Sequence, residues 1–339
     1  MTFDELHALY QLPLFELIKR AREVHEKHFP EGKIQLCTLL SIKTGGCSED
    51  CAYCSQAARY KTELERHVLM EREEVMAHAR VAKESGSTRF CMGAAWKGVR
   101  GGTEQFDRVL DIVRDVASLG MEVCVTLGEL GPEEAKQLRA AGVASYNHNL
   151  DTSPEHYPNI VTTHTYEDRL RTIRNVQDAG ISVCCGGILG LSETIADRLR
   201  LLEIISGFNP HPESVPINSL MPMPGTPLAD NPQVEPLDVV RMIACARIAV
   251  PTAKVRLSAG RSRFSDEAQA LCFYAGANSI FYGEKLLTTD NPTAAADRAL
   301  LEKLGLGTLE PDMRHTAPQA DPALPLNPQP EACAAGKCC

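Results

Sequence analysis

Short apolar runs alternate with amphipathic stretches eight times along this chain, and this alternation limits the possible folds more than any other feature. Each run has the length of one strand, and each amphipathic stretch has apolar residues at helical spacing. Gly120 and Gly142 end helical stretches, and Pro132 and Pro236 stand where helices should begin. The predicted strands are 34–42, 88–95, 122–127, 145–150, 182–189, 214–220, 254–258 and 279–282.

Eight strand–helix units in succession favour a closed parallel barrel, the (β/α)8 or TIM-type fold. An open, doubly wound parallel sheet is the alternative, because it is built from the same units. We expect the barrel over residues 34–310, after a helical extension over 1–33. Residues 311–339 are rich in Pro and Ala and are predicted to form a disordered tail carrying Cys333, Cys338 and Cys339. The predicted helices are 72–84, 103–119, 132–141, 166–179, 193–206, 236–248, 266–274 and 293–304.

The composition excludes several classes of protein. The chain has 339 residues, of which 44% are hydrophobic and 23% charged, as in folded globular proteins. A net charge of −9 with dispersed basic residues argues against a nucleic-acid-binding face and a polybasic membrane anchor. No apolar run approaches the ~18 residues of a membrane span, and Met1–Arg20 lacks a secretory signal pattern. We expect a cytoplasmic protein, or one of an organelle matrix if a targeting segment has been lost.

Cys47, Cys51 and Cys54 form the strongest local motif, C-x3-C-x2-C. They lie in the long connection after the first predicted strand, on the face where barrel enzymes carry their active sites. In a reducing compartment, clustered cysteines are metal ligands or catalytic thiols more often than disulfides. Structural zinc commonly takes two separated cysteine pairs, whereas three thiolates on a [4Fe–4S] cluster leave one iron open for a small molecule. The alternative is a loop with chance cysteines.

Three more cysteines, Cys91, Cys124 and Cys184, fall inside the second, third and fifth predicted strands. Because strand side chains alternate between faces, all three could point into the barrel and meet below the first motif. Cys185 would then face the opposite way and pack in the core. Arg89 shares the face of Cys91 and would either support this inner group or lie at the surface. The alternative is that each cysteine simply packs in the core as a small hydrophobic residue.

Polar side chains follow the fourth and sixth predicted strands. Asn147, Asn149 and Asp151 recur at period two, so they share a face if the strand stays regular there, and Asn218 could converge on them. Amides and a carboxylate at a barrel mouth suit a small polar ligand, and the alternative is a simple polar cap. The pair Gly186-Gly187 would let the backbone approach a ligand closely.

The triplet after the first strand resembles the radical S-adenosylmethionine (SAM) superfamily. Other strings resemble its biotin synthase family, and the similarity runs from about Gln35 to Leu306. These strings are Tyr-Asn-His-Asn-Leu-Asp-Thr (146–152), Ser-Val-Pro-Ile-Asn (214–218), Val-Arg-Leu-Ser-Ala-Gly-Arg (255–261) and Ala-Gly-Ala-Asn-Ser-Ile-Phe-Tyr-Gly (275–283).

The resemblance implies a role for each candidate residue. Cys47, Cys51 and Cys54 would hold a [4Fe–4S] cluster that cleaves SAM. A [2Fe–2S] cluster inside the barrel would be held by Cys91, Cys124, Cys184 and Arg256. The SAM-binding residues would be Tyr53, Gly186, Gly187 and Asp151, and the substrate-binding residues Asn149 and Asn218. A charged guanidinium has no lone pair to give, so the residues themselves indicate a buried cation balancing thiolates; the ligand role of Arg256 is implied by the resemblance alone.

The implied activity is sulfur insertion that converts dethiobiotin to biotin, driven by a 5′-deoxyadenosyl radical, with the inner cluster as sulfur donor. The implied partners are a flavodoxin or ferredoxin as electron donor, iron–sulfur assembly proteins and a second copy of the chain in a homodimer. Two other functions remain open. One is a related radical enzyme acting on another small substrate, such as an amino acid. The other is an iron–sulfur carrier or scaffold, which would need neither eight strand–helix units nor a polar barrel mouth.

Overall fold

The computed structural model describes residues 1–310 of the chain, and their strands form one closed parallel barrel. The strand order is β5-β4-β3-β2-β1-β9-β8-β7-β6, and a pairing between β5 and β7 closes the sheet. β5 (Ser182–Cys184) and β6 (Gly187–Leu189) are two segments of one barrel strand, so the barrel has eight strand positions. This confirms the TIM-type fold and excludes the open sheet. The other strands are β1 (Gln35–Lys43), β2 (Arg89–Ala94), β3 (Glu122–Thr126), β4 (Val143–Asn147), β7 (Ser214–Ser219), β8 (Lys254–Leu257) and β9 (Ser279–Phe281).

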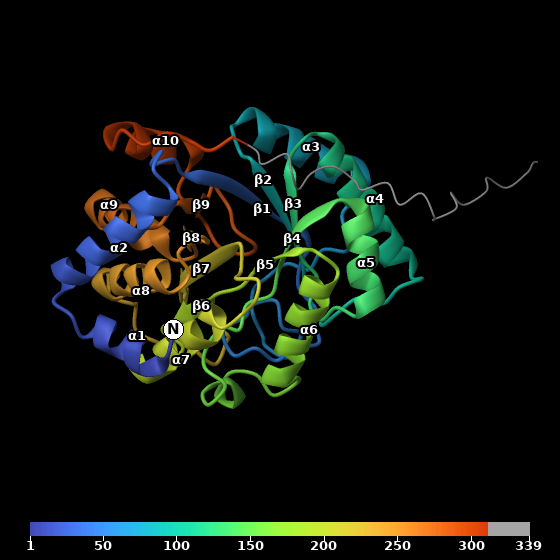
Figure 1. The fold of residues 1–339 in the computed structure, drawn as a ribbon. Helices are drawn as coiled ribbons and strands as arrows, with labels where there is room; N and C mark the ends of the chain where they lie inside the picture. The colour runs from blue at the N-terminus through green and yellow to red at the C-terminus, as the bar shows by residue number, and fades with distance from the viewer. Residues whose placement is uncertain (311–339) are drawn as a thin grey trace, which may run out of the picture.

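Eight helices alternate with the strand positions and surround the barrel (Figure 1). Their starts follow local chemistry, because the hydroxyls of Thr165 and Thr194 accept the amide of the third helical residue and close capping boxes. Pro132 and Pro236 occupy first helical positions, as predicted. These helices are α3 (Arg72–Glu84), α4 (Glu104–Ser118), α5 (Pro132–Ala141), α6 (Tyr166–Asp178), α7 (Ile195–Ser206), α8 (Pro236–Ala249), α9 (Asp266–Tyr274) and α10 (Ala294–Lys303). Short 3-10 turns occur at Tyr157–Asn159 and Arg261–Arg263.

Two further helices, α1 (Phe3–Tyr10) and α2 (Leu14–His28), precede the barrel and pack on α7 and α8 (Figure 1). They form the predicted helical extension. The Arg247 guanidinium of α8 is fully buried and lies 4.6 Å from the centre of the Phe29 ring, just after α2. The extension is therefore part of the folded body. The predicted tail, with its three cysteines, lies outside the described residues.

The fourth strand differs from its prediction. It begins at Val143 and ends at Asn147. The chain beyond is irregular, with Asp151 in the left-handed region at φ 67°, although a bridge still pairs Asp151 with Gly187. The assumption that Asn147, Asn149 and Asp151 share a strand face is therefore wrong beyond Asn147. In the part of the chain that the structure describes, no helix is both long and apolar enough to cross a membrane.

Candidate active site

A cavity of about 350 Å³ lies within the barrel and reaches the loops at the carboxyl ends of its strands. Parallel barrels carry their ligands at this end, because eight loops converge there. The wall includes the first cysteine motif and also the inner residues Cys91, Cys124 and Arg256. The three motif thiols and two of the three predicted inner thiols thus face one cavity, together with the predicted residues Tyr53, Asn149, Asp151 and Asn218.

The motif loop is held by its own acidic residues. Asp50 is buried and accepts hydrogen bonds from the amides of Thr162 and Thr163, at 2.9 and 3.2 Å, and from both hydroxyls. Burial alone would raise the pKa of Asp50, but these donors outweigh it and lower the pKa to about 2. Asp50 therefore fixes the loop between Cys47 and Cys51 against the segment that precedes α6.

Burial disfavours the thiolate form of all three motif cysteines. Burial raises the pKa of Cys47, raises that of Cys51 well above its usual range and raises that of Cys54 to about 11. Metal ligation requires thiolates, so a bound cluster would displace these protons. Three thiols on one cavity wall fit a cluster with one open iron.

The inner thiols come together as the alternation of strand faces predicts. Cys91 and Cys124 are direct partners in the register of β2 and β3, and Cys184 ends β5. All three are buried. Cys185 packs instead in the core between barrel and helices, as predicted.

A fourth thiol, Cys37 of β1, also belongs to this group and was missed by the sequence analysis. Cys37, Cys91 and Cys124 pack together in one buried cluster. Cys37 lies in the first predicted strand, so the alternation of faces was the signal that could have found it. Four thiols, rather than three, thus line the interior of the barrel.

Arg256 lies among these thiols. Its Nη2 donates to Cys37 Sγ at 3.3 Å, its Nη1 to Cys184 Sγ at 3.7 Å and its Nε to Ser279 Oγ at 3.0 Å. Burial disfavours its charge, but the neighbouring thiol groups, when ionised, outweigh burial and raise the pKa of Arg256. The residue is a cation directed at sulfur, as its chemistry indicates.

The donor set fits a multi-iron group better than a single ion. Zn–S bonds of about 2.3 Å would place tetrahedral thiolates ~4 Å apart. Among the described residues, the only three ligand atoms found within 4.8 Å of one another belong to Glu49, Glu129 and His164, not to cysteines. The inner thiols are therefore spread more widely than one tetrahedral ion requires, as a [2Fe–2S] cluster would need.

Arg89 lies below the inner thiols, and the surface alternative for it is wrong. It is buried and paired with Glu122 Oε2 at 2.6 Å and with Glu213 Oε2 at 2.8 Å. The neighbouring Cys91 thiol and, to a smaller extent, the charge of Arg89 lower the pKa of the Cys124 thiol against the effect of burial. Arg89 is therefore a buried, paired cation on the same strand as Cys91.

Tyr53 and Asp151 are brought into direct contact. The Tyr53 hydroxyl donates to Asp151 Oδ2 at 2.9 Å, and Arg169 Nη2, from α6, lies 3.5 Å from the same oxygen. Burial raises the pKa of Asp151, against the charge of Arg169. Sequence reasoning missed Arg169, because no motif connects α6 to the strand ends.

Asn149 and Asn218 flank the gap in the fifth barrel strand. Asn149 Oδ1 accepts the Gly186 amide at 3.1 Å, and Asn218 Nδ2 donates to the Gly187 carbonyl at 3.0 Å. A Cβ at Gly186 would lie 1.9 Å from the Pro216 carbonyl oxygen, and one at Gly187 would lie 2.2 Å from Leu201 Cδ2. Protein neighbours thus require both glycines, and their predicted contact with SAM stays a prediction.

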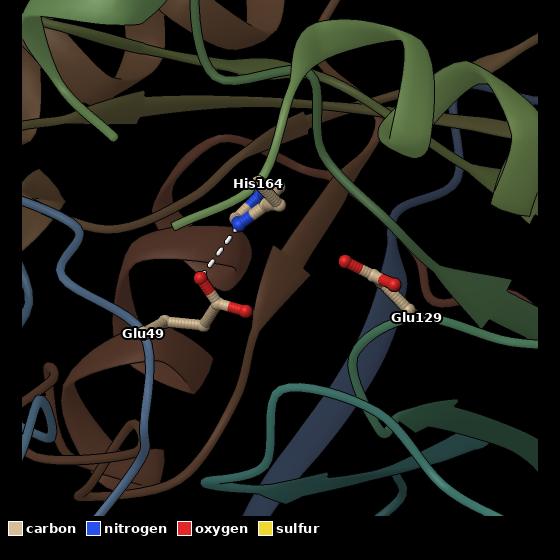
Figure 2. Close-up of side chains that lie close together, drawn as sticks. All are labelled: Glu49, Glu129 and His164. Atoms are coloured by element: carbon tan, nitrogen blue, oxygen red, sulfur yellow. Dashed lines mark hydrogen bonds and ion pairs between the residues drawn. The ribbon is translucent and has the colours of Figure 1, made fainter. Parts of the chain in front are cut away.

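Glu49, Glu129 and His164 form a second polar group that lines the cavity (Figure 2). His164 Nδ1 donates to Glu49 Oε2 at 2.6 Å, and Glu129, from the loop after β3, points toward this pair. The Tyr157 hydroxyl donates to His164 Nε2 at 2.7 Å and accepts from Arg169 Nε at 2.8 Å. Hydrogen bonds therefore connect the motif loop, through Glu49, to the Arg169–Asp151 pair. Sequence reasoning did not find Glu49, Glu129 or His164.

Comparisons with known proteins cover nearly all of the described chain. Residues 41–205 match the family model of the Radical SAM superfamily, and residues 216–307 match that of the Biotin and Thiamin Synthesis associated domain. The first match contains the motif cysteines, and the second contains Asn218 and Arg256.

Two curated relatives are 57% identical to the chain. The biotin synthase of Myxococcus xanthus (strain DK1622) aligns over 310 residues, 91% of this chain and 89% of the relative. That of Azoarcus sp. (strain BH72) aligns over 305 residues, 90% of this chain and 93% of the relative.

Among solved structures, methylornithine synthase superposes with a TM-score of 0.78 at 20% identity, over 91% of this chain and 94% of its own. HydG, a maturase of the [FeFe]-hydrogenase, gives a TM-score of 0.75 at 20% identity, over 90% of this chain and 70% of its own. At this level of identity the two structures support the fold alone.

Proposed function

The chain belongs to the biotin synthase family of radical SAM enzymes, and on that basis we propose that it inserts sulfur into dethiobiotin to form biotin. One observation carries the proposal: a single cavity is lined by the three motif thiols and by Cys91 and Cys124 of the inner group, with Asn149, Asp151 and Asn218 also facing it. A reactive carbon formed near one group could reach sulfur at the other without entering solvent.

The outer group would be the SAM site. Cys47, Cys51 and Cys54 would ligate a [4Fe–4S] cluster, which together with SAM supplies a 5′-deoxyadenosyl radical when bound. Asp151 is held by Tyr53 and Arg169 and presents a carboxylate suited to ribose hydroxyls. Tyr53 lies within the motif itself, so its ring would flank the adenine.

The inner group would be the sulfur source. Cys91, Cys124 and Cys184 would hold a [2Fe–2S] cluster, and Arg256 offers a buried positive charge that offsets the charge of the thiolates. Asn149 and Asn218 are preset by their hydrogen bonds to Gly186 and Gly187, and each keeps amide capacity for the ureido ring of dethiobiotin. Burial of the whole group keeps water from the reacting carbon.

The remaining expectations belong to the same proposal. The reaction needs a low-potential electron donor, a flavodoxin or a ferredoxin, and iron–sulfur assembly proteins to load both clusters. A homodimer and a cytoplasmic location complete the proposal.

The test is an anaerobic assay of the reconstituted chain with SAM, dethiobiotin and a low-potential reductant, read by mass spectrometry. Biotin formed together with 5′-deoxyadenosine is the expected result. Protein that carries both clusters and forms 5′-deoxyadenosine without biotin would contradict the proposed substrate. That result would favour a radical enzyme for another small molecule.

A further inference from the structure

Glu49, Glu129 and His164 come from three different loops at the carboxyl end of the barrel. Glu49 lies between the motif cysteines, Glu129 follows β3, and His164 precedes α6. Each side chain offers one ligand atom, and these three atoms lie within 4.8 Å of one another. One imidazole nitrogen and two carboxylate oxygens are a usual protein ligand set for a divalent first-row metal ion.

One carboxylate oxygen of Glu49 has no hydrogen bond. Glu49 is 7% exposed, its Oε2 accepts from His164, and its Oε1 is buried without a hydrogen-bond partner among the described residues. Figure 2 shows this second oxygen on the side of Glu49 that faces Glu129. A buried carboxylate oxygen without a donor is costly, because its lost hydration is not replaced. The atom is therefore directed at a space that a cation would fill.

The charges around this space are negative on balance. The Glu129 carboxylate makes no hydrogen bond or ion pair within residues 1–310, although it approaches a second carboxylate, that of Glu49. Two carboxylates converge at an energetic cost unless a positive charge lies between them. Lys97 Nζ is 3.5 Å from Glu49 Oε1, but it donates to the Thr163 carbonyl at 2.7 Å and its side chain is 44% exposed. One lysine thus offsets one of the two carboxylates, and it can turn to solvent when a cation binds.

We propose that Glu49, Glu129 and His164 bind a divalent metal ion such as Mn²⁺, with water completing its coordination. Metal–ligand bonds of about 2.2 Å put ligand atoms at most ~4.4 Å apart, so the site closes with a shift of a few tenths of an ångström. Binding through His164 Nδ1 leaves the imidazole neutral with its proton on Nε2. That nitrogen then donates to the Tyr157 oxygen, which also accepts from Arg169 Nε, and this contact orients the ring.

The metal ion joins the three loops that carry its ligands. Glu49 is two residues from both Cys47 and Cys51, so the ion anchors the motif loop to the loop after β3 and to the segment before α6. Its binding requires neither SAM nor sulfur transfer. The inference therefore goes beyond the proposed function and does not depend on it.

The experiment titrates Mn²⁺ into the full, anaerobically reconstituted chain without SAM and follows free Mn²⁺ by electron paramagnetic resonance. Oxidised [4Fe–4S] and [2Fe–2S] clusters are silent in this measurement, and a hard ion such as Mn²⁺ prefers carboxylates to thiolates. One site per chain is expected, and pulsed spectra should show a directly bound nitrogen. The absence of saturable binding, or a bound ion without nitrogen coupling, would overturn the inference.

Variants then locate the site. Glu129→Gln and His164→Gln keep hydrogen-bonding side chains but should weaken Mn²⁺ binding about tenfold or more, and the second should also remove the nitrogen coupling. Lys97→Met should strengthen binding about twofold to fivefold, because a competing positive charge is removed. Glu133→Gln changes an exposed carboxylate at the start of α5 and is the matched control, which should bind Mn²⁺ like the unaltered chain.

Melting temperatures measured without Mn²⁺ show whether each variant is folded. Glu129→Gln removes no side-chain hydrogen bond or ion pair of the metal-free protein, so it should melt like the unaltered chain. Added Mn²⁺ should raise the melting temperature of the unaltered chain more than that of Glu129→Gln. Unchanged Mn²⁺ affinity in both glutamine variants would place the bound ion elsewhere and overturn the inference. Biotin formation is a separate measurement, so failure of this inference is distinguishable from failure of the proposed function.

Discussion

Asp50 shows how a single residue of the cysteine motif determines the local structure. Its carboxylate accepts donors from Thr162 and Thr163, so the loop that carries Cys47 and Cys51 is fixed to a segment more than one hundred positions away in sequence. Together with Glu49, which bonds His164, it gives the motif two acidic anchors. The residues between the cysteines therefore position the cysteines.

Replacing Asp50 with Asn should destabilise the metal-free protein by about 1–3 kcal/mol at pH 7, because the buried donors of Thr162 and Thr163 lose their charged acceptor. The folded pKa of about 2 lies below the ~3.9 of an unfolded Asp. The stabilisation is therefore complete above pH ~4 and is lost as the pH falls toward 2. Melting temperatures against pH should show the two proteins converging at the acid end.

The exposed Asp178, at the end of α6, provides the control, and Asp178→Asn should melt like the unaltered chain at every pH. An Asp50→Asn variant as stable as this control at pH 7 would mean that the threonine donors contribute nothing to the loop.

At the residue scale, the sequence predicts the site residues that belong to a short motif with a recognisable spacing. It misses the residues that only the fold brings together. Cys47, Cys51 and Cys54 follow from one short motif. Arg169 and His164 come from the other side of the barrel mouth and reach Asp151 and Glu49 only in three dimensions. Cys37 differs from these, because it lies in a correctly predicted strand and only its face was not considered.

The gap between β5 and β6 is the element that most directly shapes the cavity. Gly186 lies in this gap, and its amide donates to Asn149. A Cβ at this position would lie only 1.9 Å from the carbonyl oxygen of Pro216 in β7. The glycine therefore allows the barrel to close beside Asn149.

Gly186→Ala should destabilise the protein by about 1–3 kcal/mol, because the new methyl group must push the Pro216 backbone away. Gly307→Ala is the matched control, since its Cβ would meet only the flexible Lys33 side chain at 3.5 Å. Thermal unfolding followed by circular dichroism compares the two. Equal melting temperatures for both variants would contradict the packing requirement at Gly186.

At the element scale, periodicity predicts most boundaries to within a few residues, because caps and prolines mark the helix ends. α3, α5 and α9 have the predicted bounds. The end of β4 was wrong, because a polar alternation continues through Asn149 and Asp151 after the strand has ended. Alternation of residue types cannot distinguish a strand from an irregular loop with the same spacing of polar side chains.

At the scale of the whole molecule, the N-terminal helices are docked on the barrel through buried polar groups. His25 of α2 is buried, and burial followed by the charge of Arg247 lowers its pKa to about 4. An unfolded His titrates near 6.5. Between these pH values His25 is protonated in the unfolded chain but neutral in the native protein. The free energy of unfolding therefore falls as the pH drops from ~6.5 to ~4.

His25→Leu should therefore flatten the pH dependence of the melting temperature between pH ~6.5 and ~4. The exposed His28, on the same helix, is the control, and His28→Leu should retain the slope of the unaltered chain. If His25→Leu keeps the full slope, the acid sensitivity of the fold originates elsewhere.

The closed barrel was predictable from eight repeated units, because the repeat and the chain length leave few architectures. The single cavity that joins the two thiol groups was predictable only in outline. Its wall depends on loops such as that of Leu286 and Thr288, which no periodicity describes. The contacts among Arg256, Cys37 and Cys184 depend on strand register and could not be read from spacing.

The most direct test of the account is a product analysis of Cys91→Ala beside the unaltered chain, with SAM, dethiobiotin and reductant under anaerobic conditions. The motif cysteines are untouched, so the variant should still form 5′-deoxyadenosine, while the loss of an inner thiol should abolish biotin formation. Biotin formed by Cys91→Ala at the rate of the unaltered chain would remove the inner thiol group from the reaction and contradict the proposal that the two groups act across one cavity.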